Sequence, residues 1–193
     1  EQRNACCYFF GDYDENKMMQ DFLTIDYLEH GNEIQQNVFH LLCNHQILEK
    51  LDTYKPIVVG TIPIEINIEN SDIDIIGETS NFEKATNHLT ENFSHHIEFK
   101  IDQLINNNET CLTCNFRIDT FEIEIYLENK IPTEQNAYQH MLIEAKLLEK
   151  FDEPFKNKII ELKKNGYKTE PAFAKVLELK GNPYLALLEY EVD

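Results

Sequence analysis

The chain has 193 residues, of which 42% are hydrophobic and 11% aromatic, a size and composition typical of one globular domain rather than two. Its formal net charge of -18 repels a phosphate backbone, which argues against non-specific binding to DNA or RNA. Its apolar runs are all shorter than the roughly 18 residues of a membrane span, which excludes an integral helical membrane protein.

The cysteine pattern favours a reducing compartment. The five cysteines are odd in number and scattered, and the chain opens without the charged and apolar regions of a signal peptide. We therefore expect a cytoplasmic protein with reduced thiols. Cys111 and Cys114 form a lone CxxC in an expected strand, where residues three apart face opposite sides, so this motif does not by itself indicate a zinc or redox site.

The chain divides into an extension and one expected domain. Residues 1–17 show neither a helical nor a strand period, and we assign them no role. For residues 18–193 we predict a single domain, with a core over about 33–150 and C-terminal helices over 151–193. Since strands dominate the middle and helices the end, the predicted fold class is α+β, a mixed sheet flanked by helices with a C-terminal helical extension.

In the first half, a short helix ended by Gly31 is followed by a longer helix over 33–52, for which Asn32 and Gln35 supply a capping box. The β-branched run after Pro56 predicts a buried strand over 57–61. A glycine turn leads to a second strand over 71–76. A helix follows from Asn81 to Asn92.

The second half begins with three expected strands, over 95–101, 111–119 and 121–127. The last strand alternates, which places Phe121, Ile123 and Ile125 on the core side and Glu122, Glu124 and Tyr126 on the other. Helices are predicted from Thr133, as cap, to about Lys150, from near Pro154 to Gly166, and from Thr169, as cap, to Gly181.

The candidate site lies at the second strand. Asp72 and Asp74 are two residues apart, so their side chains point to the same side and can converge on a cation, while Ile73 and Ile75 point into the core. A third carboxylate from the alternating strand, Glu124 or Glu122, would complete the oxygen ligands that paired Mg²⁺ ions need for phosphoryl chemistry. The backbone at Gly60 and the hydroxyl of Thr61 could approach phosphates closely.

Each of these features also has an ordinary structural explanation. An Asp-x-Asp after a serine is common at turns, Gly-Thr before a proline is often a plain turn, and a glutamate on an alternating strand often faces water. By periodicity alone Glu122 and Glu124 are equal candidates. The combination of spacing, a buried strand and a later acidic strand favours the metal site.

Gly60-Thr61, ten intervening residues and Asp72-x-Asp74, with a third acid on a later strand, resemble the signature of the nucleotidyltransferase (polymerase-beta-like) superfamily. In that signature the glycine is usually followed by serine, and Thr61 keeps the hydroxyl. The segments VGTIPIEINIENSDIDII, IPTEQNAYQHMLIEAKLL and GYKTEPAFAKVLELKGNPYLALL are further similar to an uncharacterised bacterial family, domain of unknown function 4269, over about Tyr27 to Leu188.

This resemblance implies a nucleotidyltransferase-type fold with two aspartates on one strand and a third carboxylate on another, and it favours Glu124 over Glu122. It also draws attention to His140, which shares a helix face with Glu144. Further nucleotide-binding candidates are Ser71, Gln135, Tyr138 and Lys168. Core packing for Tyr138, a helix-surface pair for His140 and a solvated side chain for Lys168 are the alternatives.

The sequence therefore predicts a Mg²⁺- or Mn²⁺-dependent enzyme that transfers a nucleoside monophosphate from an NTP to a hydroxyl acceptor, a small molecule or a protein. The alternative is a non-catalytic nucleotide-binding or protein-interaction module of the same fold. The base, the acceptor and the oligomeric state stay open. GxGxxG, Walker, HExxH and GxSxG motifs do not occur, which disfavours dehydrogenases, P-loop NTPases, zincins and serine hydrolases.

Overall fold

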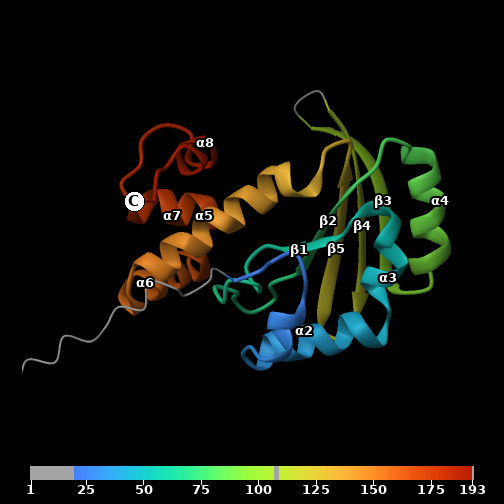
Figure 1. The fold of residues 1–193 in the computed structure, drawn as a ribbon, viewed down its shortest axis with the longest axis horizontal. Helices are drawn as coiled ribbons and strands as arrows, with labels where there is room; N and C mark the ends of the chain where they lie inside the picture. The colour runs from blue at the N-terminus through green and yellow to red at the C-terminus, as the bar shows by residue number, and fades with distance from the viewer. Residues whose placement is uncertain (1–19, 107–108, 193) are drawn as a thin grey trace, which may run out of the picture.

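The computed structural model describes residues 20–106 and 109–192, and the extension predicted for residues 1–17 lies outside them. A five-stranded sheet forms the centre, in the order β1-β2-β5-β4-β3 (Figure 1). The strands are β1 (Ile57–Val59), β2 (Ile73–Glu78), β3 (Ile97–Asn106), β4 (Glu109–Ile118) and β5 (Phe121–Glu128). β2 and β5 are parallel and the other neighbouring pairs are antiparallel. The α+β class and the mixed sheet are thus confirmed.

Helices cover the sheet in two groups. The N-terminal group comprises α1 (Asp26–Glu29), α2 (Glu33–Asn44), α3 (Ile47–Leu51), the 3₁₀ turn η1 (Asp52–Tyr54) and α4 (Phe82–Phe93). The C-terminal group follows the 3₁₀ turn η2 (Pro132–Glu134) and comprises α5 (Asn136–Lys150), α6 (Glu153–Lys164), α7 (Thr169–Val176) and α8 (Pro183–Leu188). Within the described residues, no helix is both long and apolar enough to cross a membrane.

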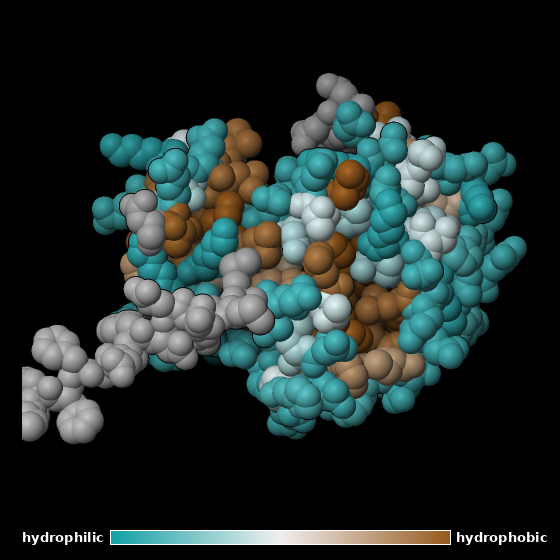
Figure 2. Space-filling view, viewed as in Figure 1, coloured by the Kyte–Doolittle hydropathy of each residue, from teal (hydrophilic) through white to brown (hydrophobic). Residues whose placement is uncertain are grey.

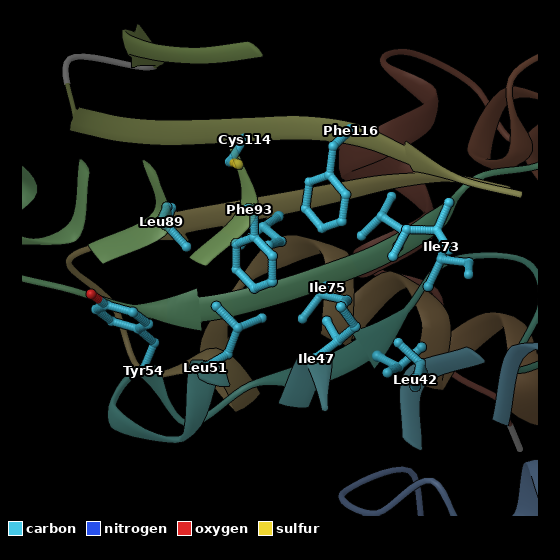
Figure 3. Close-up of a cluster of buried hydrophobic side chains, with 14 of the residues drawn as sticks. Leu42, Ile47, Leu51, Tyr54, Ile73, Ile75, Leu89, Phe93, Cys114 and Phe116 are labelled. Atoms are coloured by element: carbon cyan, nitrogen blue, oxygen red, sulfur yellow. The ribbon is translucent and has the colours of Figure 1, made fainter. Parts of the chain in front are cut away.

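Strand alternation divides the core into two clusters. On one face, Ile73, Ile75 and the inward residues of β5 pack with α2, α3 and α4, and Figure 3 shows these side chains around Phe93 and Phe116. On the other face, Ile57, Val59 and Ile76 belong to a second cluster with the C-terminal helices. In the space-filling view a notch separates the C-terminal helices from the sheet (Figure 2).

Several predicted boundaries were wrong. The helix expected over 33–52 is two helices, because Gln46 adopts a left-handed φ of 53° and turns the chain so that Ile47 and Leu51 are also buried. Asn32 and Gln35 do form the capping box. Thr133 lies inside η2 rather than at a cap, so α5 begins after Gln135.

The last helices also differ from the prediction. Lys168, not Thr169, occupies the N-cap position of α7, and its side chain makes no capping bond. The helix ends at Val176, well before Gly181. Gly181 instead precedes α8, whose N-cap Asn182 accepts backbone N–H bonds from Tyr184 and Leu185. This short helix was not predicted from the sequence.

Candidate functional site

Two carboxylates meet where the parallel strands pair. Asp74 on β2 lies directly opposite Glu124 on β5, and paired residues of neighbouring strands, about 4.8 Å apart, project from the same face. Asp72 comes one residue before β2 and two before Asp74. Ile73 and Ile75 lie in the core on the other face, as predicted. The three acids therefore share one side of the sheet.

The backbone turns at Gly60, close to the carboxylate of Asp74. The φ of Gly60, +85°, lies in the left-handed region, and a Cβ built there would overlap the Asp74 carboxylate. Val59, just before it, is the register partner of Asp74. Gly60 thus lets the backbone approach the Asp74 carboxylate closely.

Hydroxyls close the loop after this glycine. The Thr61 hydroxyl donates to Ser71 Oγ over 3.4 Å, and Ser71 Oγ accepts the backbone N–H of Ile68 over 2.9 Å. Thr61 and Ser71 both line the adjoining cavity. Their hydroxyl oxygens are therefore held at the site by local hydrogen bonds.

The structure distinguishes the two glutamates that periodicity left equal. Glu124 lines the cavity and its Oε2 accepts a bond of 3.1 Å from the Asn115 amide. Glu122 is exposed and forms an ion pair of 3.6 Å with Arg117. Glu124 is therefore the acid beside Asp74.

The surroundings of Asp74 disfavour the charged form of its carboxyl group. Its burial, and then the nearby charges of Asp72 and Glu124, raise its pKa well above the usual range, while Lys163 and Lys168 act in the opposite direction. Hard oxygen donors with surplus negative charge suit Mg²⁺ or Mn²⁺, so the donor set fits a divalent ion. Among residues 20–106 and 109–192, however, no three Asp, Glu, His or Cys side chains already form a metal-binding group.

A cavity of about 1100 Å³ opens beside the carboxylates. Its walls come from the sheet, the loop after β1, and helices α5, α6 and α7. Nine of the ten site residues predicted from sequence line it: Gly60, Thr61, Ser71, Asp72, Asp74, Glu124, Gln135, His140 and Lys168. Tyr138 does not, because its side chain is buried in the second hydrophobic cluster. Core packing accounts for Tyr138.

Gln135 and His140 have structural partners as well as a place in the wall. The Gln135 amide donates to the carbonyl oxygens of Gly77 and Lys130, each over 2.9 Å, and so joins the end of β2 to the start of α5. His140 Nε2 lies 2.9 Å from the Tyr184 carbonyl oxygen, and Nδ1 lies 3.8 Å from Glu170 Oε1. Both side chains are therefore held in place without a ligand.

Lys163 is a site residue that was not predicted from the sequence. It is only 6% exposed, its Nζ donates to the Ile66 carbonyl oxygen over 2.9 Å, and burial lowers its pKa to about 8, while Glu144 and Asp74 act to raise it. One signal was present, because Ile159, Leu162 and Lys163 follow the spacing of a buried helix face. A lysine at such a position needs a polar environment inside the fold.

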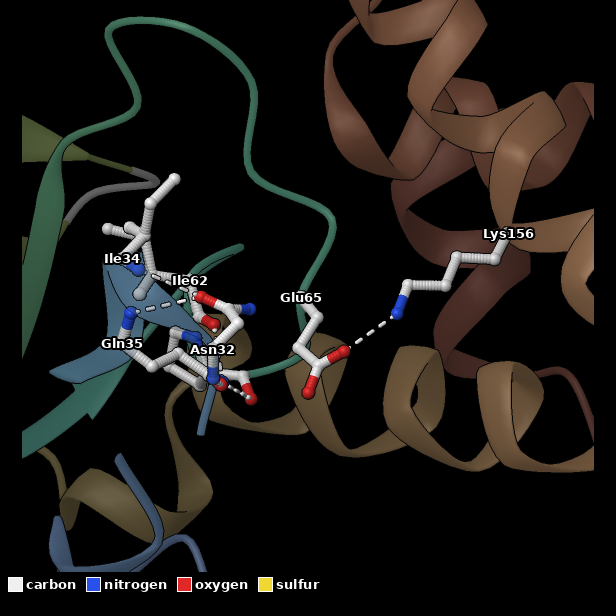
Figure 4. A network of polar contacts seen from close by, with 7 residues as sticks. Asn32, Ile34, Gln35, Ile62, Glu65 and Lys156 are labelled. Carbon is white, nitrogen blue, oxygen red and sulfur yellow. Dashed lines mark hydrogen bonds and ion pairs between the residues drawn. The ribbon is translucent and has the colours of Figure 1, made fainter. Parts of the chain in front are cut away.

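The loop after Gly60 is fixed from two sides. Gln35 on α2 donates to the carbonyl oxygens of Ile62 and Pro63, and Lys156 on α6 forms an ion pair of 2.8 Å with Glu65 (Figure 4). The bond from Lys163 to Ile66 adds a second link to α6. The corner that contacts Asp74 is thus positioned by both helical groups.

The chain is similar in fold to solved structures of other proteins. The Cid1 poly(U) polymerase bound to MgATP matches with a TM-score of 0.52 and 14% identity, over 74% of this chain and 48% of that chain. The GLD-2/RNP-8 complex matches with a TM-score of 0.51 and 16% identity, over 79% of this chain and 60% of that chain. This chain spans about half the length of the solved proteins that it matches.

The fold therefore resembles that of the polymerase-beta-like nucleotidyltransferases. A family model, domain of unknown function (DUF4269), matches residues 40–190, and the chain belongs to that family. The comparisons thus confirm both resemblances predicted from the sequence, to the nucleotidyltransferase fold and to the family DUF4269. No curated protein matches the sequence.

Proposed function

We propose that this protein is a metal-dependent nucleotidyltransferase that moves a nucleoside monophosphate from an NTP to a hydroxyl acceptor. The observation that carries the proposal is the pairing of Asp74 with Glu124 across parallel strands, with Gly60 against Asp74. Asp72 supplies a third carboxylate, and a cavity adjoins all of them. The Cid1 structure, which has the same fold, holds MgATP, and this supports the nucleotide assignment.

Each residue has a defined task in this scheme. Asp72, Asp74 and Glu124 would hold Mg²⁺, which supplies charge neutralisation for the triphosphate and lowers the pKa of the acceptor hydroxyl. The backbone at Gly60 and the hydroxyl of Thr61 contact the β and γ phosphates. Lys163 and Lys168 lie on the cavity wall and provide cations for the phosphate oxygens.

The transfer is a single displacement at the α-phosphorus. The acceptor oxygen forms a bond to that phosphorus, and the bond from the phosphorus to the bridging oxygen of pyrophosphate breaks. A carboxylate of the cluster, for which we assign Glu124, accepts the hydroxyl proton, and pyrophosphate leaves with the bonding electron pair. Placement and charge stabilisation provide the catalysis.

Replacement of Asp74 tests the proposal. Asp74→Asn keeps the shape but removes the charge, so we expect Mg²⁺-dependent NTP affinity measured by calorimetry to fall at least 100-fold. Glu122→Gln is the matched control, since it removes a carboxylate from the same sheet face outside the cavity wall. Unchanged affinity in Asp74→Asn would exclude the metal role.

A module that binds nucleotide without turnover is the second candidate. One observation favours it: among the described residues, no three side chains form a ready group of metal ligands. Incubation with α-labelled NTPs and acceptor pools separates the two. Any label transferred to an acceptor excludes a pure binder.

A further inference from the structure

β3 is an unpaired edge of the sheet. Among residues 20–106 and 109–192 it pairs with β4 alone and ends the strand order (Figure 1). Three of its apolar side chains are largely exposed: Ile97 by 70%, Leu104 by 50% and Ile105 by 79%. An edge strand offers free backbone groups to another strand, and proteins commonly block that pairing with charged side chains or bulges. β3 has both, so their positions decide whether a partner strand fits.

The bulge places four β3 side chains on one face of the sheet. The ladder with β4 shifts by one residue between Ile97 and Lys100. The β3 residues opposite every second residue of β4 are therefore Ile97, Lys100, Asp102 and Leu104, which we call the β3 quartet. Paired residues project from the same face, so the quartet is evenly spaced on one face. α4 packs on the opposite face.

The β3 quartet is complementary to a second copy of itself. Along the strand its order is apolar, basic, acidic and apolar, and Ile101 lies at its midpoint. An antiparallel copy about a two-fold axis at Ile101 places Lys100 opposite Asp102. The same copy places Ile97 opposite Leu104. Lys100 and Asp102 form an exposed ion pair of 2.6 Å within one chain, so four charges of alternating sign would meet at the axis, flanked by apolar pairs.

The backbone of β3 has the direction that this pairing needs. The Thr113 hydroxyl donates to the Asp102 carbonyl oxygen over 3.4 Å, so this carbonyl points toward β4. Backbone groups alternate in direction along a strand, so the N–H and C=O groups of Ile101 point away from β4. Two copies of Ile101 can therefore exchange both hydrogen bonds at the axis. Lys100 and Asp102 then form a non-hydrogen-bonded pair, in which side chains lie closer together.

We propose that two copies of this chain pair antiparallel along β3, about a two-fold axis at Ile101, and so form one continuous sheet. The interface is isologous, since the same residues of each copy form it. The quartet favours a second copy over an unrelated strand, because its order of charges and apolar groups matches its own reverse. Among the described residues that line the cavity, none belongs to β3, so this proposal is independent of the proposed function.

Charge reversal at the two-fold axis tests the proposal. By sedimentation velocity of the full chain at about 1–100 µM, a range around a micromolar Kd, we expect a mass near twice 22.7 kDa. Lys100→Asp and Asp102→Lys should each weaken the dimer at least about 10-fold, because four like charges then meet at the axis. An equimolar mixture of the two variants should recover the dimer, since opposite charges face each other again.

The two variants also separate local charge from the charge of the whole molecule. Lys100→Asp makes the net charge more negative and Asp102→Lys makes it less negative, so repulsion between whole molecules would change in opposite directions. The proposal predicts a weaker dimer in both. Lys180→Asp is the matched control, because this exposed lysine lies between α7 and α8, and its reversal should leave the dimer unchanged.

Three results would overturn the proposal. A wild type that stays monomeric over the whole range would exclude the second copy and leave the edge to a strand of another protein. A dimer that persists in both variants would place the interface elsewhere. A mixture that fails to recover the dimer would contradict the register at Ile101. NTP binding is a separate property, which Asp74→Asn tests.

Discussion

At Gly60 the backbone conformation directly determines how closely the chain approaches the carboxylate of Asp74. The φ of Gly60 is +85° and its Cα lies against Asp74, whereas Gly181 has a similar φ of +88° and would meet no atom within 4 Å if it carried a Cβ. Gly60→Ala should lower the unfolding free energy by at least about 1–2 kcal/mol, because an L side chain at positive φ is strained, and should also displace the Asp74 carboxylate.

The matched variant separates these two effects. Gly181→Ala carries the same backbone strain without the steric overlap, so it should lose a similar amount of stability and keep Mg²⁺-dependent NTP binding. Urea denaturation and calorimetry measure the two quantities. Equal nucleotide affinity in both variants would show that contact with Asp74 is not needed.

Glu144 makes the stability of the folded protein depend on pH, and the direction follows from its pKa. Its burial, and then Glu170, raise its pKa well above the ordinary 4.5, while Lys163 acts to lower it. The folded state therefore holds a proton that the unfolded state releases, and stability from this group is complete below pH 4.5 and lost as pH rises through the higher folded value. The slope can reach about 1.4 kcal/mol per pH unit.

Glu144→Gln removes this titration. Between pH 4.5 and 7, below the Lys163 pKa of about 8, the unfolding free energy of the wild type should fall relative to that of the variant. Denaturant melts at several pH values measure the difference. Glu134→Gln, an exposed glutamate before α5, is the control and should run parallel to the wild type. Parallel curves for Glu144→Gln would contradict the prediction.

Some site residues could be found from sequence and others could not, for physical reasons. Asp72 and Asp74 follow from a strand period of two, which packing left intact. Tyr138 and His140 are two apart on a helix and so point about 200° apart, and only His140 lines the cavity. Lys163 depends on how α6 packs against the loop at Ile66, and one segment of sequence does not encode that contact.

At the scale of elements, the N-terminus of α2 holds the loop that carries Gly60. Gln35 is 2% exposed, and its amide donates to the carbonyl oxygens of Ile62 and Pro63 over 3.0 and 3.1 Å while its Oε1 accepts the Asn32 N–H (Figure 4). Gln35→Ala would leave these groups without partners, so we expect a loss of about 1–3 kcal/mol in unfolding free energy by urea denaturation.

The neighbouring glutamine provides the control. Gln36 is exposed and its amide donates only to the carbonyl oxygen of Gly31, over 2.8 Å. Water can replace that bond, so Gln36→Ala should change stability by less than about 0.5 kcal/mol. Similar losses in both variants would mean that helix propensity, rather than the link to the loop, explains the effect.

Helices and strands were predictable where one local rule decided them. The alternation of β5 and the capping box of α2 were correct because side-chain period and cap chemistry act within a few residues. The break between α2 and α3 was not predictable, since the left-handed Gln46 is maintained by the burial of Ile47 and Leu51 in the core. Gly181 was misassigned because a glycine can end one helix or precede another.

For the whole molecule, the fold gathers acidic side chains at the cavity although the protein is already strongly acidic. The net charge is -18, and the fold places Asp72, Asp74 and Glu124 on one side of the sheet, with Asp74 partly buried among them. Such an arrangement lowers stability in the absence of a cation, as sites organised for binding commonly do. It follows that a ligand that supplies positive charge should stabilise the protein as a whole.

Thermal melts of the wild type and Asp74→Asn test this relation. Without ligand, the variant should melt at the same temperature or a few degrees higher, because it removes a partly buried carboxylate that lies close to two other acids. With Mg²⁺ and a non-hydrolysable NTP at about 100 times the wild-type Kd, the wild type should gain about 5–10 °C, and the variant should gain no more than about 2 °C. Glu122→Gln should behave as the wild type in both conditions. If the variant melts well below the wild type without ligand, Asp74 stabilises the empty fold. The claim that the clustered carboxylates lower stability in the absence of a cation would then be wrong.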